Sequence, residues 1–256
     1  INMHKVKIIF KSVFNNLKFK ILQTIRSSTK IFSDIQIYSI RGHNILFNKL
    51  SDFGKAKYFT KRDNLWEYEI SKFKDQPITL IELGVHKGYS INKFCEFNKN
   101  KDSRFYALDS FLGLPEDWTV NAKKGHFSTN GEVPKIIDSR VEIIKGWVQD
   151  TLPELLDRED IKKAKNLVVN YDLDIYSATL FSLNTIHKLK KTYLAFCDEL
   201  LSQEICALYD YLNSTGSKAT LISYTSSKTT FPFQSSFIIE SNLNYRPDIK
   251  RLYVQN

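Results

Sequence analysis

Six acidic side chains lie at or just beyond the ends of apolar runs in this 256-residue chain, where a sheet would bring them together. They are Glu82, Asp109, Asp172, Asp174, Asp198 and Glu199. Unpaired carboxylates are costly to bury, so a purely structural role does not explain such a set. Ligands of open parallel sheets bind beyond the carboxyl ends of the strands. The spacing therefore predicts an acid-lined ligand site, positioned by the elements that precede each acid.

The segment "ITLIELGVHKGYS" at residues 78–90 predicts a strand, a glycine turn and a helix, which is how a backbone approaches a bound nucleotide. Gly84 and Gly88 are four positions apart, so they do not match the G-x-G-x-x-G spacing of dinucleotide sites. Glu82 would repel a phosphate. A cationic or zwitterionic ligand, such as the methionine end of S-adenosylmethionine, fits this turn better. An ordinary strand-to-helix turn remains the alternative.

Asp109 ends the run "RFYALD", about 20 residues after the glycine turn. In nucleotide sites of this kind, a carboxylate at that place accepts the ribose hydroxyls. Behind the glycine turn, Asp109 therefore predicts the second half of a nucleoside site. Taken alone, it is also explained as a cap of a turn or helix.

Asp172, Asp198 and Glu199 follow two candidate strands and would place three carboxylates on one rim. Oxygen ligands in this number are typical of Mg²⁺, and the lack of an accompanying histidine or cysteine cluster disfavours zinc. A metal held there would lower the pKa of a bound substrate hydroxyl. Asp174 would either contact substrate or cap the helix that begins directly after it. His126 is a candidate base or substrate contact, with a solvated loop histidine as the alternative.

The net charge of +9 is concentrated in residues 1–33, which contain seven Lys or Arg and no acid, so the remainder is close to neutral. This distribution disfavours a nucleic-acid-binding domain. The same segment has apolar residues at mostly helical spacing and predicts a basic amphipathic helix. Such a helix would contact an anionic membrane surface, or pack on its own domain or on a second subunit. Lysines interrupt it throughout, so it does not match a secretory signal.

The cysteines and the lengths of the apolar runs indicate the cellular compartment of the protein. No apolar run approaches the ~20 residues that span a bilayer. Cys95, Cys197 and Cys206 form no C-x-x-C pair and indicate a reducing compartment. We therefore expect a cytoplasmic protein. The sequence leaves open whether residues 1–33 contact the inner membrane surface. Homo-oligomer formation is also left open by the sequence.

From residue 78 onward, strand-like apolar runs alternate with helical patterns, which predicts a mostly parallel sheet with helices on both faces. Residues 35–75 have the pattern of a helical cap. Residues 111–135 are rich in Gly, Pro and polar residues. A loop of this length inside a compact domain is typically a functional lid.

The segments "IELGVHKGYS", "YALDSFLGLPEDW", "IIKGWVQDTLPELL", "DLDIYSAT" and "FCDE" resemble, in this order, the macrocin O-methyltransferase-like family. The resemblance covers residues 78–240. That family belongs to the class I S-adenosylmethionine-dependent methyltransferases, so the resemblance implies their Rossmann-like α/β fold. We expect a mostly parallel seven-stranded sheet with helices on both faces over residues 76–256, after a basic helical N-terminal extension and cap over residues 1–75.

The resemblance also implies roles for individual residues. The implied cofactor-binding residues are Glu82, Gly84, Gly88, Tyr89, Ser90, Asp109, Ser110, Gly146 and Trp147. Among these, the glycine turn would hold the methionine moiety, Asp109 the ribose, and Gly146 and Trp147 the adenine. The implied ligands of Mg²⁺ are Asp172, Asp198 and Glu199. The chain departs from the family at Asn170, where a histidine is usual, and at Glu199, where the acidic pair is often Asp-Asp.

We therefore predict an enzyme, an S-adenosylmethionine-dependent and Mg²⁺-dependent O-methyltransferase that acts on a hydroxyl of a sugar or related polyol. Its partner would be a small molecule or glycan, and Asp172 and His126 are the catalytic candidates. A D-x-D glycosyltransferase is one alternative, since Asp172-Leu173-Asp174 follows an apolar strand, but it leaves the glycine turn and Asp109 unexplained. The other alternative is a non-catalytic, membrane-docked module, which the basic first segment favours and the complete acid set disfavours.

Overall fold

The computed structural model describes residues 55–200, 202–226 and 232–242, with residues 37, 38, 40–42, 44, 45 and 244. The chain divides into two compact units, Ile1–Ile37 and Tyr38–Asn256, and almost all described residues belong to the second. The predicted basic helix of residues 1–33 lies outside the described residues. The predicted domain boundary between residues 75 and 76 stays a prediction.

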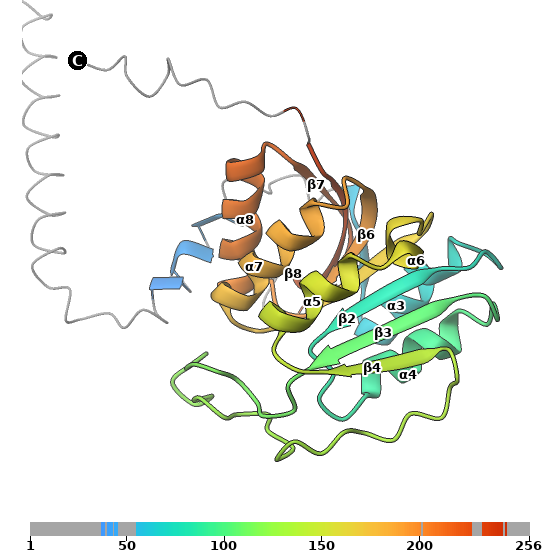
Figure 1. The fold of residues 1–256 in the computed structure, drawn as a ribbon. Coiled ribbons are helices and arrows are strands. Elements are labelled where there is room, and N and C mark those ends of the chain that lie inside the picture. The colour runs from blue at the N-terminus through green and yellow to red at the C-terminus, as the bar shows by residue number, and fades with distance from the viewer. Residues whose placement is uncertain are drawn as a thin grey trace, which may run out of the picture. The chain divides into compact units, whose positions relative to one another are not determined.

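The centre of the second unit is an eight-stranded sheet in the order β1-β7-β8-β6-β5-β2-β3-β4 (Figure 1). Strand β8 runs antiparallel to β6 and β7, and all other neighbouring strands are parallel. The chain builds outward from β2 through β3 to β4, and then places β5 on the other side of β2. The strands are β1 (Lys57–Phe59), β2 (Thr79–Leu83), β3 (Arg104–Asp109), β4 (Val141–Lys145), β5 (Leu167–Tyr171), β6 (Thr192–Cys197), β7 (Lys218–Ser226) and β8 (Pro232–Glu240).

The predicted Rossmann-like fold of class I methyltransferases, a mostly parallel sheet with helices on both faces, is confirmed. Among the described residues the sheet has eight strands rather than the seven expected, because β1 pairs in parallel with β7. We expected a helical cap over residues 35–75, and this was wrong for Lys57–Phe59. That short segment satisfies its backbone groups by adding to the open edge of β7.

Two groups of helices cover the two faces of the sheet (Figure 1). Helices α3 and α4 pack on one face, and α5, α7 and α8 pack on the other, while the short α6 follows α5. Because alternate residues of a strand point to opposite faces, Leu80 contacts the first group while Ile81 and Leu83 contact the second. Burial on both faces explains why the central strands are almost wholly apolar. The helices are α3 (Arg62–Ser71), α4 (Tyr89–Phe97), α5 (Val148–Leu156), α6 (Glu159–Lys162), α7 (Tyr176–His187) and α8 (Gln203–Thr215).

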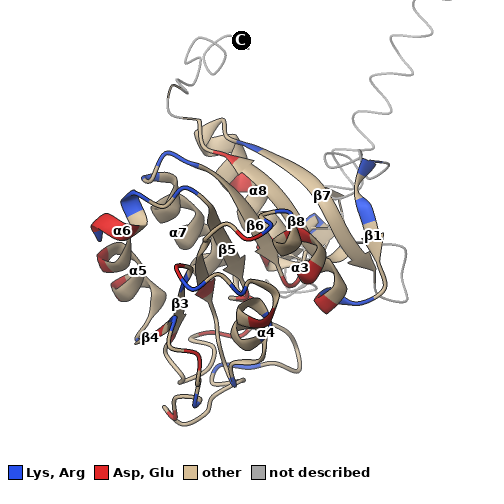
Figure 2. Cartoon of the chain, turned by 90° about the vertical axis from the view of Figure 1, so that its right-hand side faces the viewer, with Lys and Arg blue, Asp and Glu red and all other residues tan. Residues whose placement is uncertain are grey.

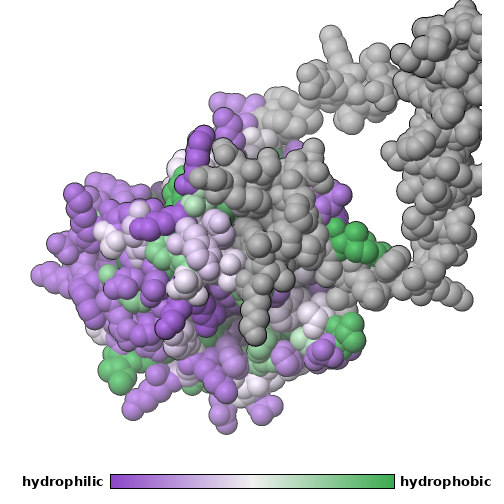
Figure 3. Space-filling model, turned by 180° about the vertical axis from the view of Figure 1, so that it is seen from behind, coloured by the Kyte–Doolittle hydropathy of each residue, from purple (hydrophilic) through white to green (hydrophobic). Residues whose placement is uncertain are grey.

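Charged residues are dispersed over the described part, and apolar residues are scattered on the face seen from behind. Figure 2 shows acidic and basic residues interspersed over its helices and loops. Figure 3 shows a mostly hydrophilic face on which hydrophobic residues form small separate groups. Among the described residues, none of the helices combines the length and the hydropathy needed to cross a bilayer.

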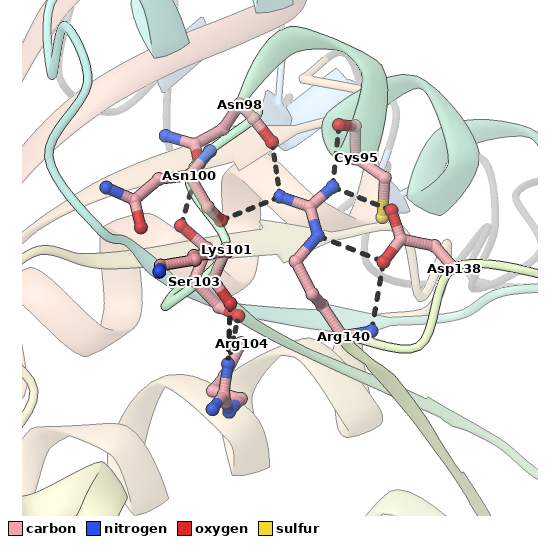
Figure 4. Close-up of polar contacts among 8 residues, drawn as sticks. All are labelled: Cys95, Asn98, Asn100, Lys101, Ser103, Arg104, Asp138 and Arg140. Atoms are coloured by element: carbon pink, nitrogen blue, oxygen red, sulfur yellow. Dashed lines mark hydrogen bonds and ion pairs between the residues drawn. The ribbon is translucent and has the colours of Figure 1, made fainter.

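Arg140, immediately before β4, ties the end of the preceding loop to the C-terminal end of α4 (Figure 4). Its Nη1 donates to the carbonyl oxygens of Asn98 (2.6 Å) and Asn100 (2.9 Å), and its Nη2 donates to that of Cys95 (2.9 Å). Asp138 accepts further hydrogen bonds from Nε (2.9 Å) and Nη2 (2.6 Å). A helix leaves its last carbonyl groups unpaired, and a cation is favoured there. Arg140 therefore fixes α4 and the loop together.

Replacing Arg140 with alanine should lower the free energy of unfolding by about 2–4 kcal/mol, because it leaves three carbonyl groups and a carboxylate without this donor. Arg104 provides the matched control, since it is exposed and its guanidinium donates to the carbonyl groups of Lys101 and Ser103. Arg104→Ala should cost less than about 1 kcal/mol. Urea unfolding followed by circular dichroism measures both losses, and equal losses would contradict this role for Arg140.

Candidate active site

A pocket of about 360 Å³ lies at the carboxyl ends of β2, β3, β4, β5 and β6. This is the switch point of the sheet, where β3 lies on one side of β2 and β5 on the other. Of the residues singled out from the sequence, Glu82, Gly88 and His126 do not line this pocket. Asp174, which the sequence left between a substrate contact and a helix cap, does line it. The other residues predicted from the sequence line it together: Gly84, Tyr89, Ser90, Asp109, Ser110, Gly146, Trp147, Asp172, Asp198 and Glu199.

Gly84 follows the end of β2, and its missing side chain allows the ends of β2 and β5 to meet. Its φ is +89°, and a Cβ there would lie well inside van der Waals distance of the Asp172 carbonyl oxygen. The Gly84 amide donates to the Leu108 carbonyl, and the Asp172 amide donates to the Leu83 carbonyl, each at 2.9 Å. The ends of β2, β3 and β5 are thereby joined around the turn.

Asp109, at the end of β3, binds the backbone of the glycine turn. Its Oδ2 accepts the amides of Val85 and His86, both at 2.8 Å, and its Oδ1 accepts the amide of Phe111 at 2.7 Å. A carboxylate offers about four acceptor positions, so three are used and one is left. The sequence predicted that Asp109 accepts ribose hydroxyls, and in this arrangement it has room for a single hydroxyl.

Glu82 is fully buried next to the turn and does not line the pocket. Its Oε1 accepts a hydrogen bond from Asn170 Nδ2 at 3.1 Å. Burial raises the pKa of this carboxyl to about 8, which favours its neutral form at pH 7. We expected Glu82 to repel a phosphate, but only the ionised carboxylate would do so, and the raised pKa disfavours that form.

Four carboxylates beyond the ends of β5 and β6 line the pocket, and we call them the acid rim: Asp172, Asp174, Asp198 and Glu199. Burial and the neighbouring charge of Asp198 raise the pKa of Asp172 well above its usual range. The same two causes raise the pKa values of Asp174 and Glu199 to about 7. Asp198 itself is paired with a cation, since Arg62 Nη1 lies 3.1 Å from its Oδ1.

The acid rim does not form the predicted magnesium site. In the described part of the chain, no three His, Cys, Asp or Glu side chains are arranged to hold a metal ion. One of the three predicted ligands, Asp198, is bound to the Arg62 guanidinium instead. The residues present therefore do not fit Mg²⁺ in this arrangement, and the magnesium prediction finds no support in the structure.

Glu204, a buried side chain in the first turn of α8, organises the acid rim and was not predicted from the sequence. Its Oε1 accepts the amides of Leu173 (3.2 Å) and Asp174 (3.3 Å), and its Oε2 accepts the amide of Glu199 (3.2 Å). Burial raises the pKa of Glu204 well above its usual range. This one carboxyl group therefore binds the backbone amides of two rim residues, Asp174 and Glu199, and that of Leu173 between Asp172 and Asp174.

Gln203 was missed as well, and it joins the rim to the loop after β3. Its Oε1 accepts the Tyr176 amide at 2.7 Å, and its Nε2 donates to the Trp118 carbonyl at 3.1 Å. A signal was available in the sequence, because the polar pair "QE" that opens α8 follows the acidic strand end after a few residues. Side chains at a helix start are well placed to bind backbone groups of neighbouring segments.

The predicted lid, residues 111–135, is a loop and forms one wall of the pocket. Gly88 packs against the residue that follows this loop, since a Cβ at Gly88 would lie 2.7 Å from Ile136 Cδ1. His126 is exposed, and its ring contacts that of Phe127 with 4.3 Å between centres. The structure does not bring His126 into the pocket. The loop residues that line the pocket are Gly113, Leu114, Pro115, Trp118 and Phe127.

Neither a protein-family model nor a curated protein matches this chain. Similar solved structures include an O-methyltransferase from Bacillus cereus in complex with SAH, which is 11% identical, has a TM-score of 0.46, and is matched over 85% of this chain and 96% of that chain. An SAH-bound methyltransferase from Podospora anserina is 16% identical, with a TM-score of 0.43 over 86% and 95%. An rRNA methylase from Streptococcus thermophilus is 13% identical, with a TM-score of 0.41 over 72% and 98%. Similarity at this level says nothing about activity, so the function has to be inferred from the site.

The raised pKa of Glu82 makes stability depend on pH in a definite direction. Its folded pKa of about 8 exceeds the ordinary value of 4.5, so between these values the folded protein binds more protons than the unfolded chain. Stability therefore falls as pH rises through this window. We expect the free energy of unfolding to decrease from about pH 5 to about pH 8. Glu82→Gln, which stays neutral, should reduce that decrease by several kcal/mol.

Urea unfolding at several pH values across this window measures the slope for both proteins. Glu96→Gln, on the exposed side of α4, is the matched control for removing a glutamate from the same region. An identical slope in the wild type and in Glu82→Gln would mean that Glu82 is ionised in the folded protein.

Proposed function

We propose that this chain is an S-adenosylmethionine-dependent O-methyltransferase whose acceptor is a polyhydroxylated molecule such as a sugar. The observation that carries the proposal is a single pocket at the switch point of the sheet, lined both by the glycine turn with Asp109 and by the acid rim. Its volume of about 360 Å³ lies in the range of small-molecule and cofactor sites.

The charge of the pocket favours a cationic cofactor over a phosphate-bearing one. Its lining contains five carboxyl groups, Asp109 and the four of the acid rim, against the two cationic side chains Arg62 and Lys87. The raised pKa values of Asp172, Asp174 and Glu199 reduce the negative charge of the empty pocket near pH 7, and a bound cation would favour their ionised forms. S-adenosylmethionine, when bound, supplies a methyl group activated by a sulfonium, and it carries an ammonium as well. A dinucleotide or a nucleoside diphosphate would instead bring negative charge to the acids.

We assign the cofactor to residues that the sequence singled out. Asp109 has one acceptor position left for a ribose hydroxyl. Gly146 and Trp147 follow β4 directly and would contact the adenine. The turn that begins at Gly84 would contact the methionine end. Glu82 would act by shaping this turn, since it does not line the pocket.

Methyl transfer to an aliphatic hydroxyl requires a group that accepts the hydroxyl proton. We assign this role to Asp172, because it lines the pocket directly after β5 and its carboxylate, in the ionised form, can accept the proton. Asp174 and Glu199, with pKa values of about 7, would accept hydrogen bonds from further hydroxyls of the acceptor. A polyol offers neighbouring hydroxyls to such a rim, whereas an anionic acceptor would be repelled.

The loop after β3 would cover the acceptor. Trp118 and Phe127 both line the pocket, with 6.2 Å between their ring centres, and the Trp118 backbone is held by Gln203. Apolar rings at this place would exclude water from the reacting atoms. Magnesium is not part of the proposal, because the acid rim does not fit it.

S-adenosylhomocysteine at 100 times its Kd should raise the free energy of unfolding by about 2.7 kcal/mol, and UDP-glucose should not. Asp109→Ala should lose this effect, because it removes the ribose acceptor and the two amide contacts that hold the glycine turn. Asp117→Ala, which removes an exposed acid of the loop after β3, is the matched control and should keep the full effect. Thermal shift assays measure all three proteins. Stabilisation by UDP-glucose alone would favour the D-x-D glycosyltransferase alternative.

Asp172→Asn should lower kcat by at least about 100-fold, because the amide cannot accept the hydroxyl proton. Its affinity for S-adenosylhomocysteine should change little. His126→Ala should keep kcat near the wild-type value, since that side chain lies outside the pocket. Methyl incorporation from labelled S-adenosylmethionine into a panel of sugars and glycosides measures both variants. An active Asp172→Asn with an inactive His126→Ala would move the role of base to His126.

A further inference from the structure

Arg62, the first residue of α3, places a guanidinium against the acid rim. Its Nη1 lies 3.1 Å from Asp198 Oδ1, and it lines the same pocket as Asp172 and Glu199. The two partners are 136 positions apart in the chain. The pair therefore brings a segment that precedes the parallel strands of the core to the carboxyl end of β6.

Two aromatic rings hold this guanidinium in place. Its central carbon lies 5.0 Å from the centre of the Trp66 ring and 5.4 Å from that of the Tyr89 ring. Cations are attracted to the faces of such rings. The Tyr89 hydroxyl also donates to Asp63 at 2.5 Å, which joins the first turns of α3 and α4. Arg62 is thus positioned by the fold, with its side chain 36% exposed.

A divalent metal ion and this guanidinium would compete for the same carboxylate. Mg²⁺ takes oxygen ligands from several side chains, and Asp198 is one of the three that the sequence offers for it. An ion bound to Asp198 would lie within a few ångströms of the Arg62 charge, and like charges at that distance repel. The guanidinium already supplies the counter-charge that a partly buried group of carboxylates requires.

We infer that Arg62 is the built-in cation of this site, which balances the acid rim, orients Asp198 and keeps divalent metals out. The consequence for catalysis rests on the proposed function: methyl transfer by this protein needs no divalent metal. Arg62 is a positioning residue that acts through Asp198. Its fixed positive charge also favours the negative charge that develops on an acceptor oxygen as the proton leaves for Asp172.

Manganese binding tests this inference independently of any activity. By electron paramagnetic resonance, the wild-type full chain should show no saturable Mn²⁺ site. Arg62→Met should bind the ion at least about tenfold more tightly, because Asp198 is released. The double variant Arg62→Met/Asp198→Asn should lose the gained site. Arg158→Met, which removes an exposed arginine paired with Glu142 outside the pocket, is the matched control and should behave as the wild type.

Arg62→Lys keeps the charge, so it should exclude Mn²⁺ as the wild type does, and it is available if Arg62→Met does not fold. Wild-type methyl transfer should be unchanged in EDTA. Saturable Mn²⁺ binding by the wild type that Asp198→Asn abolishes would overturn the inference, as would activity that EDTA removes and Mn²⁺ restores. A protein that binds no S-adenosylhomocysteine, yet gains a Mn²⁺ site only when Arg62 is replaced, would refute the proposed function while supporting the role of Arg62.

Discussion

The close contact between the ends of β2 and β5 is the constraint on which the rest of the site depends. A side chain at Gly84 would run into the Asp172 carbonyl group, and the φ of +89° is one that glycine adopts without strain. This contact sets the distance between the glycine turn and the acid rim. Asp109 then fixes the turn from β3 through the amides of Val85 and His86. The pocket is thus shaped mainly by backbone positions, which close packing keeps in place.

Buried acids hold this end of the sheet together at a cost in free energy. Glu82 and Glu204 are both withdrawn from solvent, and burial raises the pKa of each. Glu204 nevertheless accepts three backbone amides beside the rim, which an apolar residue could not do. Proteins retain such local costs chiefly at functional sites. Both acids lie behind residues that line the pocket, and this agrees with a binding or catalytic role for this edge of the sheet.

The fold class and most of the pocket lining could be predicted from the sequence for a geometric reason. Apolar runs that alternate with helical patterns from residue 78 onward have few packing solutions other than a parallel sheet covered on both faces. In such a sheet the carboxyl ends of all parallel strands meet at one edge, so the residues that follow them are neighbours whatever their separation in the chain. This is why Gly84, Asp109, Gly146 and Asp172, which follow or end different strands, line one pocket.

Three features of the site were decided only by the tertiary structure. Arg62 and Asp198 are 136 positions apart, and Glu204 reaches Leu173 over 31 positions, so the sequence does not show which segment either side chain contacts. Burial, which favours the neutral form of Glu82, depends on what packs around a side chain and not on its place in a strand. The sequence by itself determined the strand ends at which the rim acids stand. The direction of each carboxylate depends on its rotamer and on the groups around it, which only the tertiary structure supplies. In the described part of the chain, Asp198 binds the Arg62 guanidinium and is not part of a group arranged to hold a metal ion.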